Sequence, residues 1–440
     1  MRGCCFFLAG MVLAWPAGGE PLTLDAAIAE ALASSSALAA RSAQVDQAGE
    51  EAAALKTRLL PKLQFELMGG YLLDEVEFVF PRGALGVYPA TGPIPGDDIP
   101  IVAGDQFTVL GNLQIAQPLS QLLSIRLATR ASEAGQKVAA AELASARLEL
   151  VAAVTELYFG LLETGSSLRS GGAALARLRE LVRQLEELAE KQVVLPADLL
   201  EAKLALASRE HQQRVLENAE ISRREELLRL LGRPLDGVLE LAELPPPAPY
   251  EGSLEQARKT ALAARPDLEV ARHRAEQAEL AARAEKAGRW PELSLALQYV
   301  TPYQLDPLPD HIASLGLQFS WEPWDWGRRR HEVAAREATA RAARATVADA
   351  EGRVYTEVGR ASRRLAEARE VVELSRLGVE LAAERVRVAR VRFDQEAVQA
   401  IEVLTAEAAL ADAEARSTAA RLELWQAHAA FRRTLAEEKP

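Results

Sequence analysis

The sequence predicts a mixed α and β membrane protein with an internal two-fold repeat. Residues 22–71 align without a gap with residues 252–301, at a constant offset of 230 positions. Two long stretches lack proline and carry apolar residues at helical spacing, and four shorter segments alternate apolar and polar side chains. A repeat of this length is too long for one unit of a solenoid, so it indicates that one half-structure is used twice.

The aligned segments share residues along their whole length. The pairs include Leu24 with Leu254, Ala31 with Ala261, Leu38 with Leu268, Lys56 with Lys286 and Pro61 with Pro291. We therefore expect a first structural repeat over residues 20–245 and a second over residues 246–436, each with short helices, two strands and a long helical hairpin.

The first 19 residues predict a secretory signal peptide. Arg2 supplies a positive start, Cys4 to Leu13 an apolar run, and Ala17-Gly18-Gly19 a small-residue cleavage site. A buried N-terminal helix is the alternative, but the apolar run is too short to span a bilayer. Both cysteines, Cys4 and Cys5, would leave with the signal, so we expect an exported chain without disulfides or thiolate metal sites.

The composition argues against several classes of function. The chain has 440 residues and a formal net charge of −12, with only short basic clusters, so it lacks the basic face that nucleic acid requires. No phosphate-binding glycine loop or nucleophile elbow is present, and the histidines lack metal-ligand spacing. We therefore expect no enzyme, no cofactor and no metal site. The histidines are His211, His273, His311, His331 and His428.

The proline-free stretches predict two long helical hairpins, over about 121–231 and about 326–436. The first breaks at Pro196, which suits the first turn of a new helix. The second break is placed at 394–399, because residues 200–202 align with 404–406 at an offset of 204. Heptad-spaced apolar residues predict coiled-coil seams. They are Leu178, Leu181, Leu185 and Leu188 in the first hairpin, and Leu374, Leu377, Leu381, Val388 and Val391 in the second.

The alternating segments predict four strands, at about 62–80, 105–117, 291–302 and 311–321. Strands of about ten residues with one apolar and one polar face suit a transmembrane barrel, whose outer face meets lipid and whose lumen is wet. A water-soluble sandwich is the alternative. Tryptophans at one end of the second pair favour the barrel, because aromatic residues gather at membrane interfaces. They are Trp290, Trp321, Trp324 and Trp326.

Four strands cannot close a barrel, and open edges in lipid are prohibitively costly. Three copies, giving twelve strands, are the smallest arrangement with a lumen wider than a plug of side chains. We therefore expect a homotrimer, in which each protomer contributes two strand hairpins. The glycine- and proline-rich segment 81–105 and the shorter 302–310 are the expected extracellular loops.

Several motifs resemble those of TolC-like outer-membrane efflux proteins. They are Leu22 to Leu32 followed by Leu60 to Leu63, Gln117-Pro118-Leu119, Leu195 to Ala202, Leu230 to Leu235, and Glu322 to Gly327. The resemblance implies a twelve-stranded barrel in the outer membrane and a twelve-helix coiled-coil tunnel in the periplasm. It also implies a passive exit duct of a tripartite efflux or type I secretion system, docked to a periplasmic adaptor and an inner-membrane transporter.

The resemblance also implies a pore constriction at the periplasmic tips of the hairpins. By motif match its acids are Asp198 and Glu402, six carboxylates in a trimer, which would favour cations. The alternative is that each carboxylate only stabilises the start of its helix.

The tip departs from the family pattern at three positions. Phe393 stands where a tyrosine is usual, Glu396 where glycine is usual, and Val398 where a basic residue is usual. These residues, together with Pro196, predict a tip closed by apolar packing rather than by a polar latch. We expect the second hairpin to be the one that moves.

A second class of function stays open at this point, namely a structural coiled coil that spans the periplasm. The exported substrate does not follow from the sequence, because the pump selects it.

Overall fold

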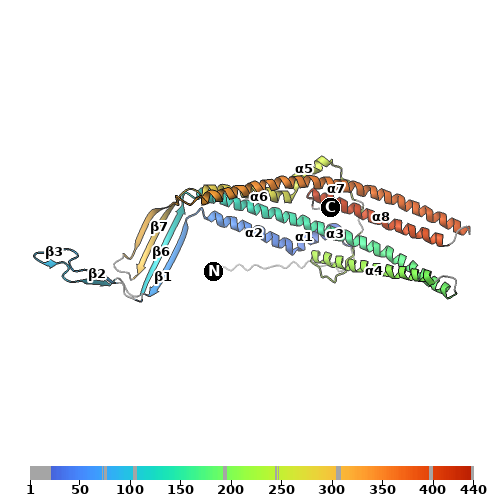
Figure 1. Cartoon of the computed structure of the whole chain (residues 1–440), viewed down its shortest axis with the longest axis horizontal. Coiled ribbons are helices and arrows are strands. Elements are labelled where there is room, and N and C mark those ends of the chain that lie inside the picture. Colours follow the sequence, from blue (N-terminus) through green and yellow to red (C-terminus); the bar gives the residue numbers. More distant parts are fainter. Residues whose placement is uncertain are drawn as a thin grey trace, which may run out of the picture. The chain divides into compact units, whose positions relative to one another are not determined.

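The structure is a computed structural model that describes residues 21–71, 73, 77–102, 107–191, 196–242, 245, 247–303, 309–395 and 400–437. Eight helices and eight strands are found in this part of the chain (Figure 1). The chain divides into two compact units. We call Met1–Arg41, Glu142–Asp267 and Ala350–Pro440 the helical unit, and Ser42–Ala141 with Leu268–Asp349 the sheet unit.

Four strands form the main sheet of the sheet unit. They are β1 (Lys62–Tyr71), β6 (Phe107–Pro118), β7 (Glu292–Tyr303) and β8 (Ile312–Ser320). Their order is β1-β6-β7-β8, and every neighbouring pair is antiparallel. Each half of the sequence therefore supplies two adjacent strands, and the halves meet at the β6–β7 pair (Figure 1).

A second, smaller set of strands lies between β1 and β6 in the sequence. It comprises β2 (Glu77–Phe80), β3 (Val87–Tyr88), β4 (Gly92–Pro93) and β5 (Ile99–Val102). β2 pairs with β5 and β3 pairs with β4, so residues 77–102 form one hairpin, which we call the distal hairpin. The single strand expected over 62–80 is therefore two strands, because β1 ends at Tyr71 and β2 pairs with β5 in a separate sheet. The segment expected as a loop over 81–105 contains three of these short strands.

The long helices pair as two antiparallel hairpins. The first consists of α3 (Leu122–Glu190) and α4 (Pro196–Leu231), and the second of α7 (Arg328–Asp394) and α8 (Ala400–Thr434). Ion pairs connect Arg179 with Glu210 at 2.9 Å and Arg390 with Glu407 at 2.8 Å. Both α3 and α7 contribute residues to both units. No helix of the described ranges is long and apolar enough to cross a membrane.

Four shorter helices precede the strands. They are α1 (Leu24–Ser34), α2 (Ser36–Thr57), α5 (Leu254–Ala264) and α6 (Pro266–Ala287). Thr23 caps α1 by accepting a hydrogen bond from the Ala26 N–H at 3.3 Å, and Ser253 forms a capping box with Gln256 at the start of α5. These caps satisfy N–H groups that have no partner within the helix, which explains why both helices begin where they do.

The helical unit contains two hydrophobic clusters, one from each half of the sequence. Equivalent positions of the two repeats are buried in the two clusters. Equivalent residues are 230 positions apart between α1 and α5, and 204 positions apart between the long helical hairpins. The pairs are Ala27 with Ala257, Ala31 with Ala261, Val154 with Val358, Leu161 with Leu365, Leu227 with Phe431, and Leu231 with Leu435. We call the first set the N-cluster and the second the C-cluster.

The apolar seam predicted on α7 is not the buried one. Leu374, Leu377 and Leu381 are 53–70% exposed. The buried positions on this part of α7 are instead Leu365, Ala368, Ala382 and Val386. In the C-cluster Leu365 and Ala368 of α7 pack with Ala427 and Phe431 of α8, whereas the leucine stripe is exposed in the single chain.

Candidate functional site

One face of the main sheet is apolar on all four strands. Because successive side chains of a strand point to opposite faces, the register places Leu63, Ile115, Leu297 and Leu315 in one row across the sheet. Most of this face is solvent-exposed in the single chain. Phe65 is 68% exposed, and Leu63, Leu67, Leu315, Leu317 and Phe319 are 62–70% exposed. An apolar surface of this extent indicates a face that other molecules cover.

The opposite face of the sheet is polar. The neighbouring row consists of Gln64, Gln114, Gln298 and Ser314. Gln298 donates a hydrogen bond to Asn112 at 3.3 Å, and Gln64 donates one to Glu66. Amide and hydroxyl groups of this kind suit contact with water. The sheet therefore has one apolar and one polar face.

Aromatic side chains mark both ends of the sheet. Trp290 precedes β7 and Trp321 follows β8, and the pairing of Glu292 with Ser320 places them at the same end. Trp324 and Trp326 follow, with ring centroids 5.7 Å apart. All four indoles are exposed, from 58% to 88%.

The opposite end carries a second aromatic set, consisting of Tyr71, Phe107 and Tyr303. Tyr71 pairs with Phe107, while Tyr303 pairs with Val109 on the next strand. All three lie on the apolar face by register and are 53–64% exposed. The sequence alone does not single them out, because only the register shows that they share one end of the sheet.

A capped turn joins β8 to α7 at the tryptophan end. The Asp325 carboxylate accepts hydrogen bonds from the backbone N–H groups of Gly327 at 3.0 Å and Arg329 at 3.1 Å. The Arg329 N–H in particular lowers the pKa of Asp325. Trp326 and Gly327 have φ of 55° and 84°, so the chain reverses sharply there. The motif Glu322 to Gly327 thus builds a strand-to-helix corner.

The two outer strands of the main sheet each have a partner on one side only. Within the described ranges β1 and β8 stand at the ends of the order β1-β6-β7-β8. Their outward backbone N–H and C=O groups are available for pairing with another chain.

The residues predicted for the pore constriction occupy equivalent places. Asp198 is the third residue of α4 and Glu402 the third residue of α8. Their side chains lie outside the described part of the structure, as does that of Phe393 in the last turn of α7. Glu396 and Val398 lie outside the described residues altogether. Pro196 is the first residue of α4 and is exposed.

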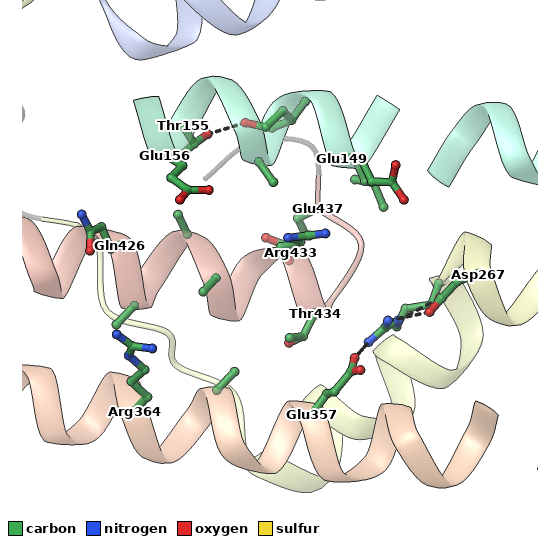
Figure 2. A pocket seen from close by; sticks show the side chains of 18 of the residues that line it. Glu149, Thr155, Glu156, Asp267, Glu357, Arg364, Gln426, Arg433, Thr434 and Glu437 are labelled. Atoms are coloured by element: carbon green, nitrogen blue, oxygen red, sulfur yellow. Dashed lines mark hydrogen bonds and ion pairs between the residues drawn. The ribbon is translucent and has the colours of Figure 1, made fainter. Parts of the chain in front are cut away.

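The helical unit also contains a cleft of about 760 Å³ between α3, α7, α8 and the start of α6. Figure 2 shows Glu149 and Glu156 entering it from α3, opposite Arg433 of α8. Arg265 donates to Asp267 at 2.6–2.9 Å and to Glu357 at 2.5 Å, which ties α6 to α7. The lining mixes acids and bases. In the described part of the chain no three His, Cys, Asp or Glu residues are grouped as metal ligands.

One family model matches part of the chain. Residues 257–437 match the family model of the outer membrane efflux protein. No curated protein matches the sequence.

Solved structures of outer-membrane proteins share the fold over nearly the whole chain. The outer-membrane channel OprN aligns with a TM-score of 0.75 and 19% identity, over 95% of this chain and 91% of its own. The CmeC channel of Campylobacter jejuni gives 0.75 and 16%, over 95% and 87%. The outer membrane protein VceC of Vibrio cholerae gives 0.74 and 18%, over 94% and 96%. The family match and the shared fold confirm the resemblance to TolC-like outer-membrane efflux proteins.

Proposed function

We propose that three copies of this chain form an outer-membrane channel that is the passive exit duct of a tripartite efflux or type I secretion system. The observation that carries this proposal is the main sheet, with its exposed apolar face, its polar face and its two open edges. The channel proteins that share the fold support it.

The dimensions of the sheet suit a membrane. A transmembrane strand needs about 9–11 residues, and the four strands have 10, 12, 12 and 9 residues. Pairing β8 of one copy with β1 of the next removes both edges, and a barrel of twelve strands encloses a lumen lined by the polar row of Gln64. The two aromatic sets then lie at the two membrane interfaces, as in other outer-membrane barrels.

The helices continue the duct in the periplasm. In the single chain the leucine stripe of α7 (Leu374, Leu377 and Leu381) is largely exposed to solvent, and so are Leu200 and Leu204 of α4. These side chains are 53–72% exposed. Neighbouring helices of the other copies would cover them and close a tunnel of twelve helices. Two structural repeats per chain, over 20–245 and 246–436, give this tunnel pseudo-six-fold symmetry.

The tips of the hairpins form the entrance. Asp198 and Glu402 each stand in the first turn of their helix, and six such carboxylates would favour cations in a narrow pore. Phe393, Val398 and Pro196 would hold the tip closed by apolar packing, with Glu396 at the turn between α7 and α8. Contact with an adaptor and an inner-membrane pump opens it by realigning the second hairpin.

The test is the conductance of the purified protein in a planar bilayer. The combined variant Asp198→Asn, Glu402→Gln should lose selectivity for cations, because the ring of negative charge is gone. Glu201→Gln, which removes an exposed carboxylate close to Asp198, is the matched control and should leave selectivity unchanged. A high spontaneous conductance that neither variant alters would refute the constriction.

Deletion of the gene separates this proposal from a purely structural role of the long helices. Loss of a duct sensitises cells to exported compounds. Loss of a scaffold disturbs the envelope without such selective sensitivity, and that result would favour the alternative of a periplasm-spanning structural coiled coil.

A further inference from the structure

The distal hairpin exposes an unusual number of large apolar side chains. Phe78 is 58% exposed, Val87 73% and Leu85 63%. Val79, Phe80, Tyr88, Ile94, Ile99 and Ile101 are 39–54% exposed. The hairpin carries only four charged residues, which are Glu77, Arg82, Asp97 and Asp98. Large apolar side chains exposed in this number are expected to be covered by another molecule.

The hairpin is nevertheless an ordered element. β2 and β5 pair from Glu77 opposite Val102 to Phe80 opposite Ile99. The Arg82 N–H donates to the Asp98 carboxylate at 2.6 Å, and the Leu85 N–H donates to the Ile94 carbonyl at 2.9 Å. An isolated two-stranded hairpin is at best marginally stable in water. Burial of its apolar side chains by a partner would stabilise the hairpin, so we expect a partner to cover them.

The chain connections place this hairpin beyond the membrane-spanning strands. It follows β1, which ends at Tyr71, and precedes β6, which begins at Phe107. That is the end of the main sheet opposite the tryptophans. β1 and β6 have 10 and 12 residues and already cross a bilayer, so the hairpin lies outside the apolar band of the barrel.

We propose that the distal hairpins of three copies pack on one another and narrow the outer opening of the channel. This inference rests on the proposed trimer. The occupant is a second copy because the hairpin continues from β1, the edge strand that a second copy must pair with to close the barrel. Barrel closure also holds the three hairpins at a high effective concentration, so that weak apolar contacts between them suffice.

The first test is disulfide cross-linking of the trimer. The two cysteines of the sequence, Cys4 and Cys5, lie in the predicted signal peptide, so the wild type serves as the cysteine-free control. The variant Phe78→Cys should give a covalent dimer band after oxidation, and the band should disappear on reduction. A trimer that forms no such band contradicts the proposal.

The second test is conductance in a planar bilayer. The variant Phe78→Ser, Phe80→Ser should raise the conductance of the open channel, because polar side chains weaken the packing of the hairpins. Asp97→Ser is the control in the same hairpin and should leave the conductance unchanged. An unchanged conductance in the double serine variant, with an intact trimer, would overturn the inference.

A third measurement distinguishes a lipid-covered hairpin from a protein-covered one. A fluorophore attached to the F78C variant should not be quenched by brominated phospholipids, and quenching would show that lipid is the occupant. The mass of the wild type in detergent separates the two proposals. A trimeric, conducting wild type without hairpin contacts refutes only this inference, whereas a wild type that is neither trimeric nor conducting refutes both.

Discussion

The two clusters of the helical unit have the same plan and different interiors. In the N-cluster, the hydroxyl of the buried Tyr158 lies 2.9 Å from the Leu22 carbonyl oxygen and 2.8 Å from that of Ala242, and its single hydrogen is shared between these two acceptors. These contacts connect α3 to both ends of the first repeat. Phe159 packs beside it, and the cluster is otherwise aliphatic. The polar atoms of this cluster are thus satisfied.

Polar side chains directly follow two members of the C-cluster in the chain, Arg258 after Ala257 and His428 after Ala427. Arg258 stands where α1 has Ile28, and its guanidinium lies 3.6 Å from the centroid of the Tyr355 ring. His428 is 2% exposed. Within the described ranges Nε of Arg258 and Nε of Arg432 are buried without a hydrogen-bond partner. Unsatisfied buried polar atoms destabilise a fold, so we expect the second half to be the less stable one.

The largest effect should come from deleting a buried leucine at equivalent positions. Leu231→Ala and Leu435→Ala both remove side chains that are 2% exposed. Each should lower the free energy of unfolding by about 2–5 kcal/mol. Leu231→Ala should lower it more, since the N-cluster is the better satisfied. Denaturant unfolding in detergent, followed by circular dichroism, measures both.

The control for these variants is Val238→Ala. This side chain is 87% exposed, so its truncation should change the free energy of unfolding little. A larger loss for Leu435→Ala than for Leu231→Ala would reverse the comparison.

The next effect concerns the hydroxyl of Tyr158. Tyr158→Phe should lower the free energy of unfolding by about 1–3 kcal/mol, because the Ala242 carbonyl loses the hydroxyl as its donor. The Leu22 carbonyl still accepts from the Ala242 N–H. Tyr355→Phe, which keeps the ring beneath Arg258, is the matched control. Equal losses in the two variants would show that the hydroxyl of Tyr158 has no special role.

Tyr158 also predicts a dependence on alkaline pH. Burial raises the pKa of Tyr158 to about 12 from 10.0. As the pH rises above 10, the unfolded chain releases this proton first, so stability should fall between pH 10 and pH 12. In Tyr158→Phe this part of the pH dependence should be absent.

A smaller effect is expected at the ends of α4 and α8. Gly232 and Ala436 occupy equivalent positions with φ of 70° and 61°. A residue with a Cβ in this conformation costs roughly 1–2 kcal/mol. Ala436→Gly should therefore raise the thermal midpoint and Gly232→Ala should lower it, the latter also because an added Cβ would meet Ser34 Cβ at 3.0 Å. Shifts of the same sign would refute this reasoning.

The smallest effect is a dependence on acidic pH in the C-cluster. Burial, followed by the charges of Arg432 and Arg369, lowers the pKa of His428 below 6.5, while the Ala248 carbonyl and Glu437 act in the opposite direction. The unfolded chain therefore takes up this proton first as the pH falls, and stability should decline as the pH falls from 6.5 through the folded-state pKa. In His428→Leu the decline in unfolding free energy between pH 7 and pH 5 should be weaker. An identical profile in the wild type and the variant would contradict it.

Several features of the fold follow from local sequence. The absence of proline from 119–195 permits α3, and Pro196 begins α4, because proline fits a first helical turn. Alternation identifies both faces of β7 and β8, since a strand has a period of two residues. The first-turn position of Asp198 is likewise local, because Pro196 marks the start of α4. That of Glu402 follows from the 204-residue offset of the repeat, since no proline or glycine marks the start of α8.

Other features were decided by the tertiary structure alone. Sequence patterns do not show that β1 stops at Tyr71, or that Tyr71, Phe107 and Tyr303 share one end of the sheet, because register depends on strands far apart in the chain. Nor do they show which apolar stripe of α7 faces α8, since leucine and alanine stripes both have helical spacing. Local periodicity determines which residues share a face, whereas the partner of that face depends on contacts between distant segments, and these exist only in the folded chain.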